Sequence, residues 1–133
     1  MTFSKKNILL ASIPVAILLL VYFFYNPEDF DWFPKCPFYS LTGVYCPGCG
    51  SQRALHSLVH LEFGKTASYN FLFLPALGVV LYNFGITVFN ELSGKQLTNY
   101  IYKPIFPKVV LIIVLLFWGL RNIPFSPFCY LAP

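Results

Sequence analysis

The sequence predicts an all-α membrane protein with three transmembrane helices, a short interfacial amphipathic helix and a cysteine knuckle loop. Hydrophobic residues make up 57% of the 133 residues and charged residues 11%, against about 45–50% and about 25% in soluble domains. Three long apolar stretches alternate with polar loops, and three of the four cysteines gather in residues 36–54. The length suits a single membrane domain, residues 1–133.

The first predicted span covers residues 7–25, which follow Lys5 and Lys6 and carry no charge. A secretory signal peptide also begins with positive charge and an apolar core. This apolar run is longer than a usual signal core and leads into N-P-E-D-F rather than a small-residue cleavage site. We therefore expect a retained anchor, which the acidic and aromatic residues 26–35 end.

The interfacial helix is predicted over residues 51–62, where apolar side chains recur at helical spacing. A helix this short is marginal alone in water, and the bilayer interface would stabilise it. The second span is expected at residues 69–89 and the third at residues 105–120. The apolar stripe of the interfacial helix consists of Ala54, Leu55, Leu58 and Leu61.

The positive-inside rule favours a cytoplasmic N-terminus. With three spans, this orientation places five Lys residues inside and four Lys or Arg residues outside. The cysteine loop and interfacial helix, residues 26–68, and the C-terminus then both lie outside the cytoplasm. Cys129 therefore shares a compartment with the three cysteines of the loop. The outside set is Lys35, Arg53, Lys65 and Arg121.

The run C-P-G-C-G at residues 46–50 has the form of a metal-binding knuckle, because two thiolates two residues apart can hold one ion. Zinc normally takes four ligands. Cys46 and Cys49 would supply two and Cys36 a third, with Cys129 or a histidine as the fourth. His56 and His60 have the i, i+4 spacing of paired metal ligands, although a polar interfacial face explains them more simply.

Two other interpretations of the cysteines remain open. In an oxidising compartment the four cysteines can form disulfides, and the sequence does not choose among three pairings. The Cys46-x-x-Cys49 spacing is also that of thiol–disulfide exchange sites, with Arg53 and a helix start nearby to lower a thiol pKa. In that case Cys46 and Cys49 are the catalytic pair, and Cys36 with Cys129 could relay electrons.

Other function classes find little support in the sequence. It contains no G-x-S-x-G, H-E-x-x-H or Walker-type glycine loop. The net charge of +4 is small and its lysines are scattered, so no nucleic-acid partner is expected. Arg53 has a planar fork that suits a lipid phosphate or a partner carboxylate, or it bonds loop carbonyls while its stem lies in the interface.

The stretch C-P-F-Y-S-L-T-G-V-Y-C-P-G-C-G-S-Q-R-A at residues 36–54 resembles the signature of an uncharacterised family of small bacterial membrane proteins, a domain of unknown function. Its signature is C-P, then T-G-x-x-C-P-G-C-G, then R-A after a short gap. The resemblance implies a bacterial inner-membrane protein and no assigned activity. The family commonly has a proline directly after Asn70, whereas Phe71 stands here. The matching residues are Cys36, Pro37, Thr42, Gly43, Cys46, Pro47, Gly48, Cys49, Gly50, Arg53 and Ala54.

The function expected from these features is that of a non-catalytic accessory subunit, which contacts membrane lipid and a larger envelope assembly. Its small size and the lack of a catalytic constellation motivate this expectation. A metal, with zinc the candidate, or a disulfide would close the knuckle. The alternatives are a membrane thiol–disulfide oxidoreductase using Cys46 and Cys49, and a lipid-headgroup binder using Arg53.

Overall fold

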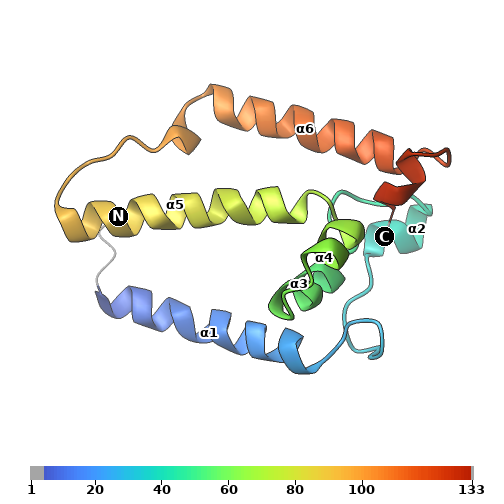
Figure 1. Ribbon diagram of the computed structural model, residues 1–133, viewed down its shortest axis with the longest axis horizontal. Coiled ribbons are helices and arrows are strands. Elements are labelled where there is room, and N and C mark those ends of the chain that lie inside the picture. The colour runs from blue at the N-terminus through green and yellow to red at the C-terminus, as the bar shows by residue number, and fades with distance from the viewer. Residues whose placement is uncertain (1–4, 133) are drawn as a thin grey trace.

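A computed structural model describes residues 5–132, and within that range the chain is all-helical with no strand. Three long helices, α1 (Lys5–Phe24), α5 (Phe73–Ser93) and α6 (Ile105–Arg121), extend from one end of the molecule. The short helices α2 (Pro37–Thr42), α3 (Ser51–Val59) and α4 (Phe63–Tyr69) gather at that end with the 3₁₀ turn η2 (Phe128–Leu131) (Figure 1). This end, which we call the cysteine end, holds nearly all the buried residues.

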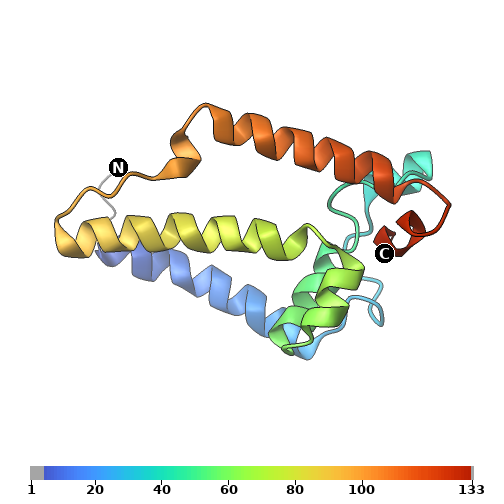
Figure 2. The same ribbon diagram turned by 45° about the horizontal axis from the view of Figure 1, so that its top comes forward.

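The long helices make few direct contacts with one another, and α6 stands apart from α5 in both views (Figure 1 and Figure 2). None of the residues of α5 is buried. Large apolar side chains such as Leu18, Leu81 and Leu116 are at least half exposed. Soluble monomers rarely expose so much contiguous apolar surface. The faces of these helices are therefore suited to lipid or to another protein.

Only α5, among the described residues, has both the length and the apolar composition to cross a membrane. The apolar segment Ser12–Phe24 is shorter, and α6 has 17 residues. The all-helical class predicted from the sequence is confirmed, whereas crossing by α1 and α6 stays a prediction. A second 3₁₀ turn, η1 (Tyr100–Tyr102), leads into α6 at the other end of the molecule.

The segment between the cysteines and α5 differs from its prediction. The expected helix over residues 51–62 ends at Val59, because Leu61 takes a positive φ of 61° and turns the chain. Residues expected to lead directly into the second span instead form α4, which packs against α3. Asn70 is extended and accepts the Leu72 N–H on Oδ1 at 3.1 Å, so the long helix starts at Phe73 rather than residue 69.

Candidate metal centre

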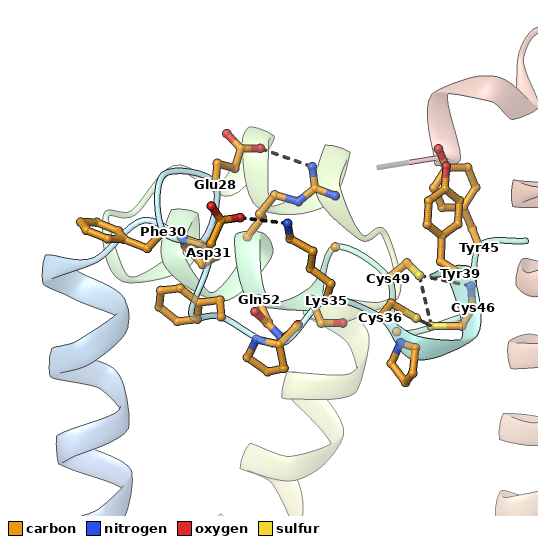
Figure 3. A pocket seen from close by; sticks show the side chains of 18 residues that line it. Glu28, Phe30, Asp31, Lys35, Cys36, Tyr39, Tyr45, Cys46, Cys49 and Gln52 are labelled. Carbon is orange, nitrogen blue, oxygen red and sulfur yellow. Dashed lines mark hydrogen bonds and ion pairs between the residues drawn. The ribbon is translucent and has the colours of Figure 1, made fainter. Parts of the chain in front are cut away.

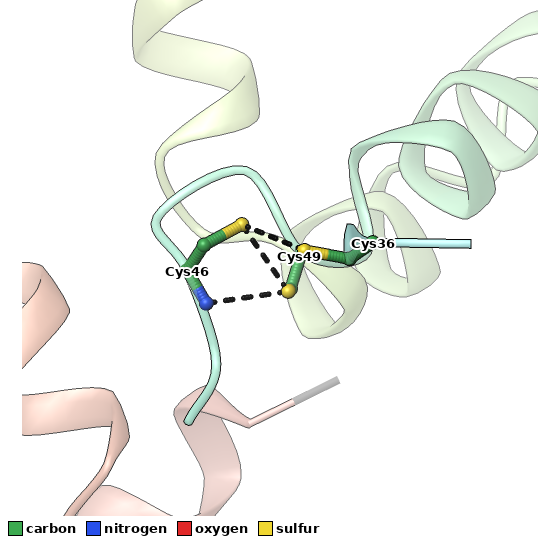
Figure 4. A group of neighbouring side chains, drawn as sticks. All are labelled: Cys36, Cys46 and Cys49. Carbon is green, nitrogen blue, oxygen red and sulfur yellow. Dashed lines mark hydrogen bonds between the residues drawn. The ribbon is translucent and has the colours of Figure 1, made fainter. Parts of the chain in front are cut away.

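Three thiols meet at the cysteine end. Cys36 lies at the start of α2, and Cys46 and Cys49 belong to the turn that leads into α3. The Sγ atom of Cys46 is 3.4 Å from that of Cys36 and 3.3 Å from that of Cys49, and all three lie within 4.8 Å of one another (Figure 4). Sulfur ligands of a tetrahedral zinc stand about 3.8 Å apart, given Zn–S bonds of about 2.3 Å. The cluster therefore has the dimensions of a metal site.

No disulfide joins these sulfurs, and all four cysteines of the chain are free thiols in the described structure. Cys46 contacts both of its neighbours, so its sulfur is the centre of the cluster. Its own N–H donates to Cys49 Sγ at 3.3 Å. An N–H directed at a sulfur stabilises the thiolate form, as in metal knuckles.

The remaining motif residues shape the backbone around the sulfurs. Pro37 occupies the first turn of α2, where its missing N–H costs nothing. Thr42 donates to the Phe38 carbonyl at 2.7 Å, and Gly43 ends α2 with a φ of 70°. Gly50 precedes α3 with a φ of 81°. A side chain at either glycine would meet the steric penalty of the left-handed region.

Pro47 and Gly48 form the tip of the Cys46–Cys49 turn. The Cys49 N–H donates to the Cys46 carbonyl at 3.1 Å, and the Ser51 N–H donates to the Gly48 carbonyl at 3.1 Å. These bonds keep the two sulfurs on one side of the turn. The carbonyl oxygens of Pro47 and Cys49, together with the second lone pair of the Cys46 carbonyl oxygen, accept hydrogen bonds from side chains elsewhere in the chain.

Arg121, the last residue of α6, supplies several of those bonds. Its Nη1 donates to the carbonyls of Cys46 at 2.9 Å and Pro47 at 3.2 Å, and its Nη2 donates to the Cys49 carbonyl at 3.2 Å. The residue is 1% exposed, and its guanidinium stacks over the Phe117 ring at 4.9 Å. None of the ion pairs in residues 12–132 includes it. A buried cation therefore lies against the cysteine turn without a carboxylate partner.

Two asparagines complete the support of the turn. Asn70, only 2% exposed, donates from Nδ2 to the carbonyls of Pro47 at 2.9 Å and Cys49 at 3.2 Å, and to Ser51 Oγ at 3.1 Å. Asn122 pairs with the backbone of Tyr45, accepting its N–H at 2.8 Å and donating to its carbonyl at 2.9 Å. The end of α6 and the start of α5 are thus both joined to the cysteine loop.

The protein environment shifts the pKa values of Cys36 and Cys49 in opposite directions. The backbone of Tyr39 in the first turn of α2 lowers the pKa of Cys36, against some opposition from burial. Burial, followed by hydrogen bonding to Cys46 and Cys36, raises the pKa of Cys49 to about 12. In the metal-free cluster the Cys49 thiol therefore holds its proton at neutral pH. A bound metal ion would displace that proton.

The other residues considered as ligands do not join the cluster. Cys129 is exposed in η2 and lies outside the group of three cysteines, despite its predicted place as a fourth ligand. His56 Nδ1 is 2.7 Å from the Tyr22 carbonyl, which joins α3 to α1. His60 stacks on Phe23 with ring centroids 4.8 Å apart. The two histidines therefore serve the packing of α3 on α1, as the simpler interpretation expected.

Arg53 lies beside the cluster but is engaged with other groups. Its Nη1 is 3.3 Å from Glu28 Oε1, and its guanidinium lies 5.1 Å from the centre of the Tyr69 ring. Its side chain is 31% exposed. The residue therefore connects the loop after α1 with α3 and α4. The neighbouring Gln52 donates to the Pro34 carbonyl at 2.9 Å and fixes the same loop.

A cavity of about 840 Å³ opens onto the thiols. Figure 3 shows Cys36, Cys46 and Cys49 beside Tyr39 and Tyr45 at one end, with Glu28 and Asp31 toward the other. Tyr39 and Tyr45 stack with ring centroids 4.6 Å apart. The Arg53–Glu28 pair and the Lys35–Asp31 pair, at 2.9 Å, line the cavity, so its charged side chains balance in pairs.

Sequence reasoning missed the three residues that hold the turn. The sequence places Arg121 only among the positive charges outside the cytoplasm, and it predicts no role at the cysteines for Asn70 or Asn122. One signal is present, since an arginine followed by an asparagine at the end of an apolar helix supplies several hydrogen-bond donors that need acceptors. That signal does not say which carbonyls the arginine contacts, 72 to 75 residues earlier in the chain.

Comparison with curated proteins and with solved structures finds no match. A family model described as "Protein of unknown function (DUF2752)" matches residues 36–84. This segment contains the three clustered cysteines, Arg53 and Asn70, and it excludes Cys129 and Arg121. The predicted resemblance to an uncharacterised family is therefore confirmed over residues 36–84, the segment that this family model matches.

Proposed function

We propose that Cys36, Cys46 and Cys49 bind zinc as thiolates, and that the bound ion braces the cysteine end of a small membrane protein. The observation that carries this proposal is the burial of Arg121 against the cysteine turn without a carboxylate. A buried cation without a compensating charge costs several kcal/mol. Three thiolates on a divalent ion carry a net charge of −1, which compensates the one guanidinium. Neutral thiols or disulfides would leave the guanidinium charge uncompensated.

The same charge balance favours zinc among the metals that take thiolates. Soft sulfur ligands select zinc, Cu(I) or iron–sulfur clusters. With three thiolates, Cu(I) would leave a charge of −2 against a single arginine. Zinc leaves −1, and the Cys-x-x-Cys turn with its N–H directed at sulfur has the form of a zinc knuckle.

The metal-bound turn joins the three long helices. Arg121 and Asn122 connect it to the end of α6, and Asn70 connects it to the start of α5. Helix α3 begins directly after the turn, and its His56 contacts the carbonyl of Tyr22 on α1. A rigid turn would therefore fix how the three helices leave the cysteine end.

We place the protein in the bacterial inner membrane with α1, α5 and α6 as spans and the cysteine end outside the cytoplasm. The apolar composition and exposure of these helices support this placement, and Lys5 and Lys6 favour a cytoplasmic N-terminus. Because the helices contact one another so little, their remaining faces suit lipid and a partner helix. The role is that of an accessory subunit braced by its metal.

The test is a joint measurement on protein purified in a mild detergent. Bound metal is measured by mass spectrometry, and thiols that react with a maleimide are counted before and after denaturation with a chelator. We expect one zinc per chain and one reactive thiol, Cys129, rising to four after chelation. Metal-free protein whose extra thiols appear only after reduction would overturn the zinc proposal in favour of disulfides.

The thiol–disulfide oxidoreductase is the second candidate, and the accessible position of the thiols on the cavity favours it. Its attacking group would be Cys36, whose pKa is lowered, rather than Cys49 with a pKa of about 12. The Cys36 thiolate would attack a partner disulfide and release one partner thiolate. The Cys46 thiolate would then attack the mixed disulfide, forming Cys36–Cys46 and releasing the reduced partner.

Rapid trapping distinguishes this candidate. A Cys46→Ser variant should accumulate a mixed disulfide through Cys36 with a model disulfide, whereas a Cys36→Ser variant should not. Equal reaction of both variants would speak against it. A headgroup site at Arg53 finds no comparable support, because its guanidinium already pairs with Glu28 and stacks on Tyr69.

A further inference from the structure

We infer that the zinc site keeps a fourth coordination position open to the cavity, and that this position takes a neutral nitrogen ligand of the imidazole type from outside the chain. The inference rests on the proposed zinc site and goes beyond it. The knuckle would then be an open metal site at which a second molecule binds the ion, rather than a closed structural site.

The first step is the count of ligands. Zinc in proteins takes four ligands, and sites with three protein ligands leave one position for water or another molecule. Within the described residues, the cluster of potential ligands contains three cysteines and no histidine, carboxylate or fourth cysteine. His56 and His60 are engaged on the α1 side of α3, and Cys129 is exposed in η2.

The second step is access to the metal. All three cysteines line the cavity of about 840 Å³. Small-molecule sites commonly enclose about 300–1,000 Å³, whereas one water needs about 30 Å³. The cavity thus has room for an organic ring beside the thiols, and the stacked Tyr39 and Tyr45 form an aromatic wall there (Figure 3).

The third step is charge. Zinc with three thiolates and the Arg121 guanidinium sum to zero, and the Arg53–Glu28 and Lys35–Asp31 pairs on the cavity wall add no net charge. An anionic fourth ligand would leave a partly buried negative charge uncompensated, which is costly. A neutral donor would leave the site without a net charge. Among protein-type donors, imidazole nitrogen is the neutral ligand that zinc prefers.

The experiment uses full-length protein in detergent with Co²⁺ in place of zinc, because thiolate-bound Co²⁺ has charge-transfer and d–d absorption bands. Imidazole and azide are titrated separately, as neutral and anionic probes. We expect a saturable shift of the d–d bands with imidazole, with the charge-transfer bands retained. Azide should bind at least tenfold more weakly. A Cys129→Ser variant should give the starting spectrum and the imidazole response of the wild type.

Two further arms identify the source of the ligand. An acetylated, amidated Gly-His-Gly peptide is compared with imidazole. Binding of the peptide at least as tight as that of imidazole would assign the position to a histidine of a partner protein. Binding of imidazole alone would assign it to a small molecule. Both results support a neutral nitrogen ligand.

Several results would overturn the inference. One is a set of d–d bands that imidazole leaves unchanged, and another is azide binding as tight as imidazole binding. A changed starting spectrum in Cys129→Ser would show that the tail fills the position. Absence of any thiolate-to-cobalt charge-transfer band would instead show that the metal site itself fails, an outcome distinct from bound cobalt that does not respond to imidazole.

Discussion

The Arg121 guanidinium donates a 2.9 Å hydrogen bond to the carbonyl of Cys46, a residue 75 positions earlier in the chain. The bond connects the end of α6 to the backbone of Cys46, the residue whose sulfur lies at the centre of the thiol cluster. Because Arg121 is buried and has no carboxylate partner among residues 12–132, it links the charge of the cluster to the packing of a long helix. Removal of the guanidinium should therefore weaken metal binding by the thiolates. Removal of the thiolates should in turn weaken the packing of α6.

Replacement of Arg121 tests this link. Arg121→Met removes the positive charge and the guanidinium hydrogen bonds to the carbonyls of Cys46, Pro47 and Cys49, so zinc affinity should fall by at least tenfold. Folding stability should fall by about 3–5 kcal/mol, the usual cost of removing one partner of a buried ion pair. Arg121→Lys keeps the positive charge but loses the planar guanidinium fork. Its zinc affinity and stability should therefore lie between those of the wild type and Arg121→Met. The measurements are competition with a zinc-binding dye and thermal unfolding in detergent. Equal affinity in Met and Lys variants would contradict the charge argument.

Substitution of Asn70 tests the other support of the turn. Asn70→Asp has nearly the same shape but cannot donate to the Pro47 and Cys49 carbonyls, which would then face a carboxylate. We expect a loss of about 1–3 kcal/mol, because the carbonyls lose the Asn70 donor and would face carboxylate oxygens that can only accept. Gln96→Glu is the control, since it makes the same chemical change on an exposed side chain. The midpoint of thermal unfolding should drop only for Asn70→Asp.

Single cysteine substitutions separate the cluster from the tail. Serine at position 36, 46 or 49 removes one of three thiolates, so each variant should lose most of its bound zinc and unfold at a lower temperature. Cys129→Ser should keep one zinc per chain with unchanged stability, because Cys129 is exposed and outside the cluster. Metal content and melting are measured together. Loss of zinc in Cys129→Ser would show that the tail closes over the site.

The pH dependence of zinc binding follows from the raised pKa of Cys49, which is about 12 in the metal-free protein. Zinc must displace the Cys49 proton at any pH below that value, and proton release makes metal affinity rise with pH. Cys49 alone should therefore raise the apparent association constant about tenfold per pH unit between pH 6 and 8. Cys36, with its lowered pKa, should add less at the upper end of this range. Affinity that stays constant with pH would contradict thiolate coordination.

Gly50 provides a test of the turn that leaves the ligands and their charges unchanged. Its φ of 81° lies in the left-handed region, so Gly50→Ala should destabilise the fold by about 1–2 kcal/mol. Gly64→Ala is the matched control, because Gly64 lies inside α4 and a Cβ there meets nothing within 4 Å. That substitution should be neutral or mildly stabilising. Both effects are measured by thermal unfolding of the zinc-loaded protein.

The predicted features that depend on neighbouring residues agree well with the structure. Apolar stretches gave three long helices close to their expected positions, and the motif residues between Cys36 and Gly50 gave a turn that brings sulfurs together. The helix predicted over residues 51–62 was less accurate, because Leu61 takes a left-handed conformation and α4 packs back on α3. Local pattern does not reveal such a reversal, since it depends on the packing of two short helices.

By itself, the sequence determined the helical class, the apolar character of the long helices and the closeness of Cys46 to Cys49, because each depends on residues a few positions apart. Only the tertiary structure decided that Cys36 completes the cluster, that Cys129 stays outside it, and that Arg121, Asn70 and Asn122 hold the turn. The physical reason is that these partners lie up to 77 residues apart. Their meeting depends on how whole helices leave the cysteine end, which no local spacing encodes.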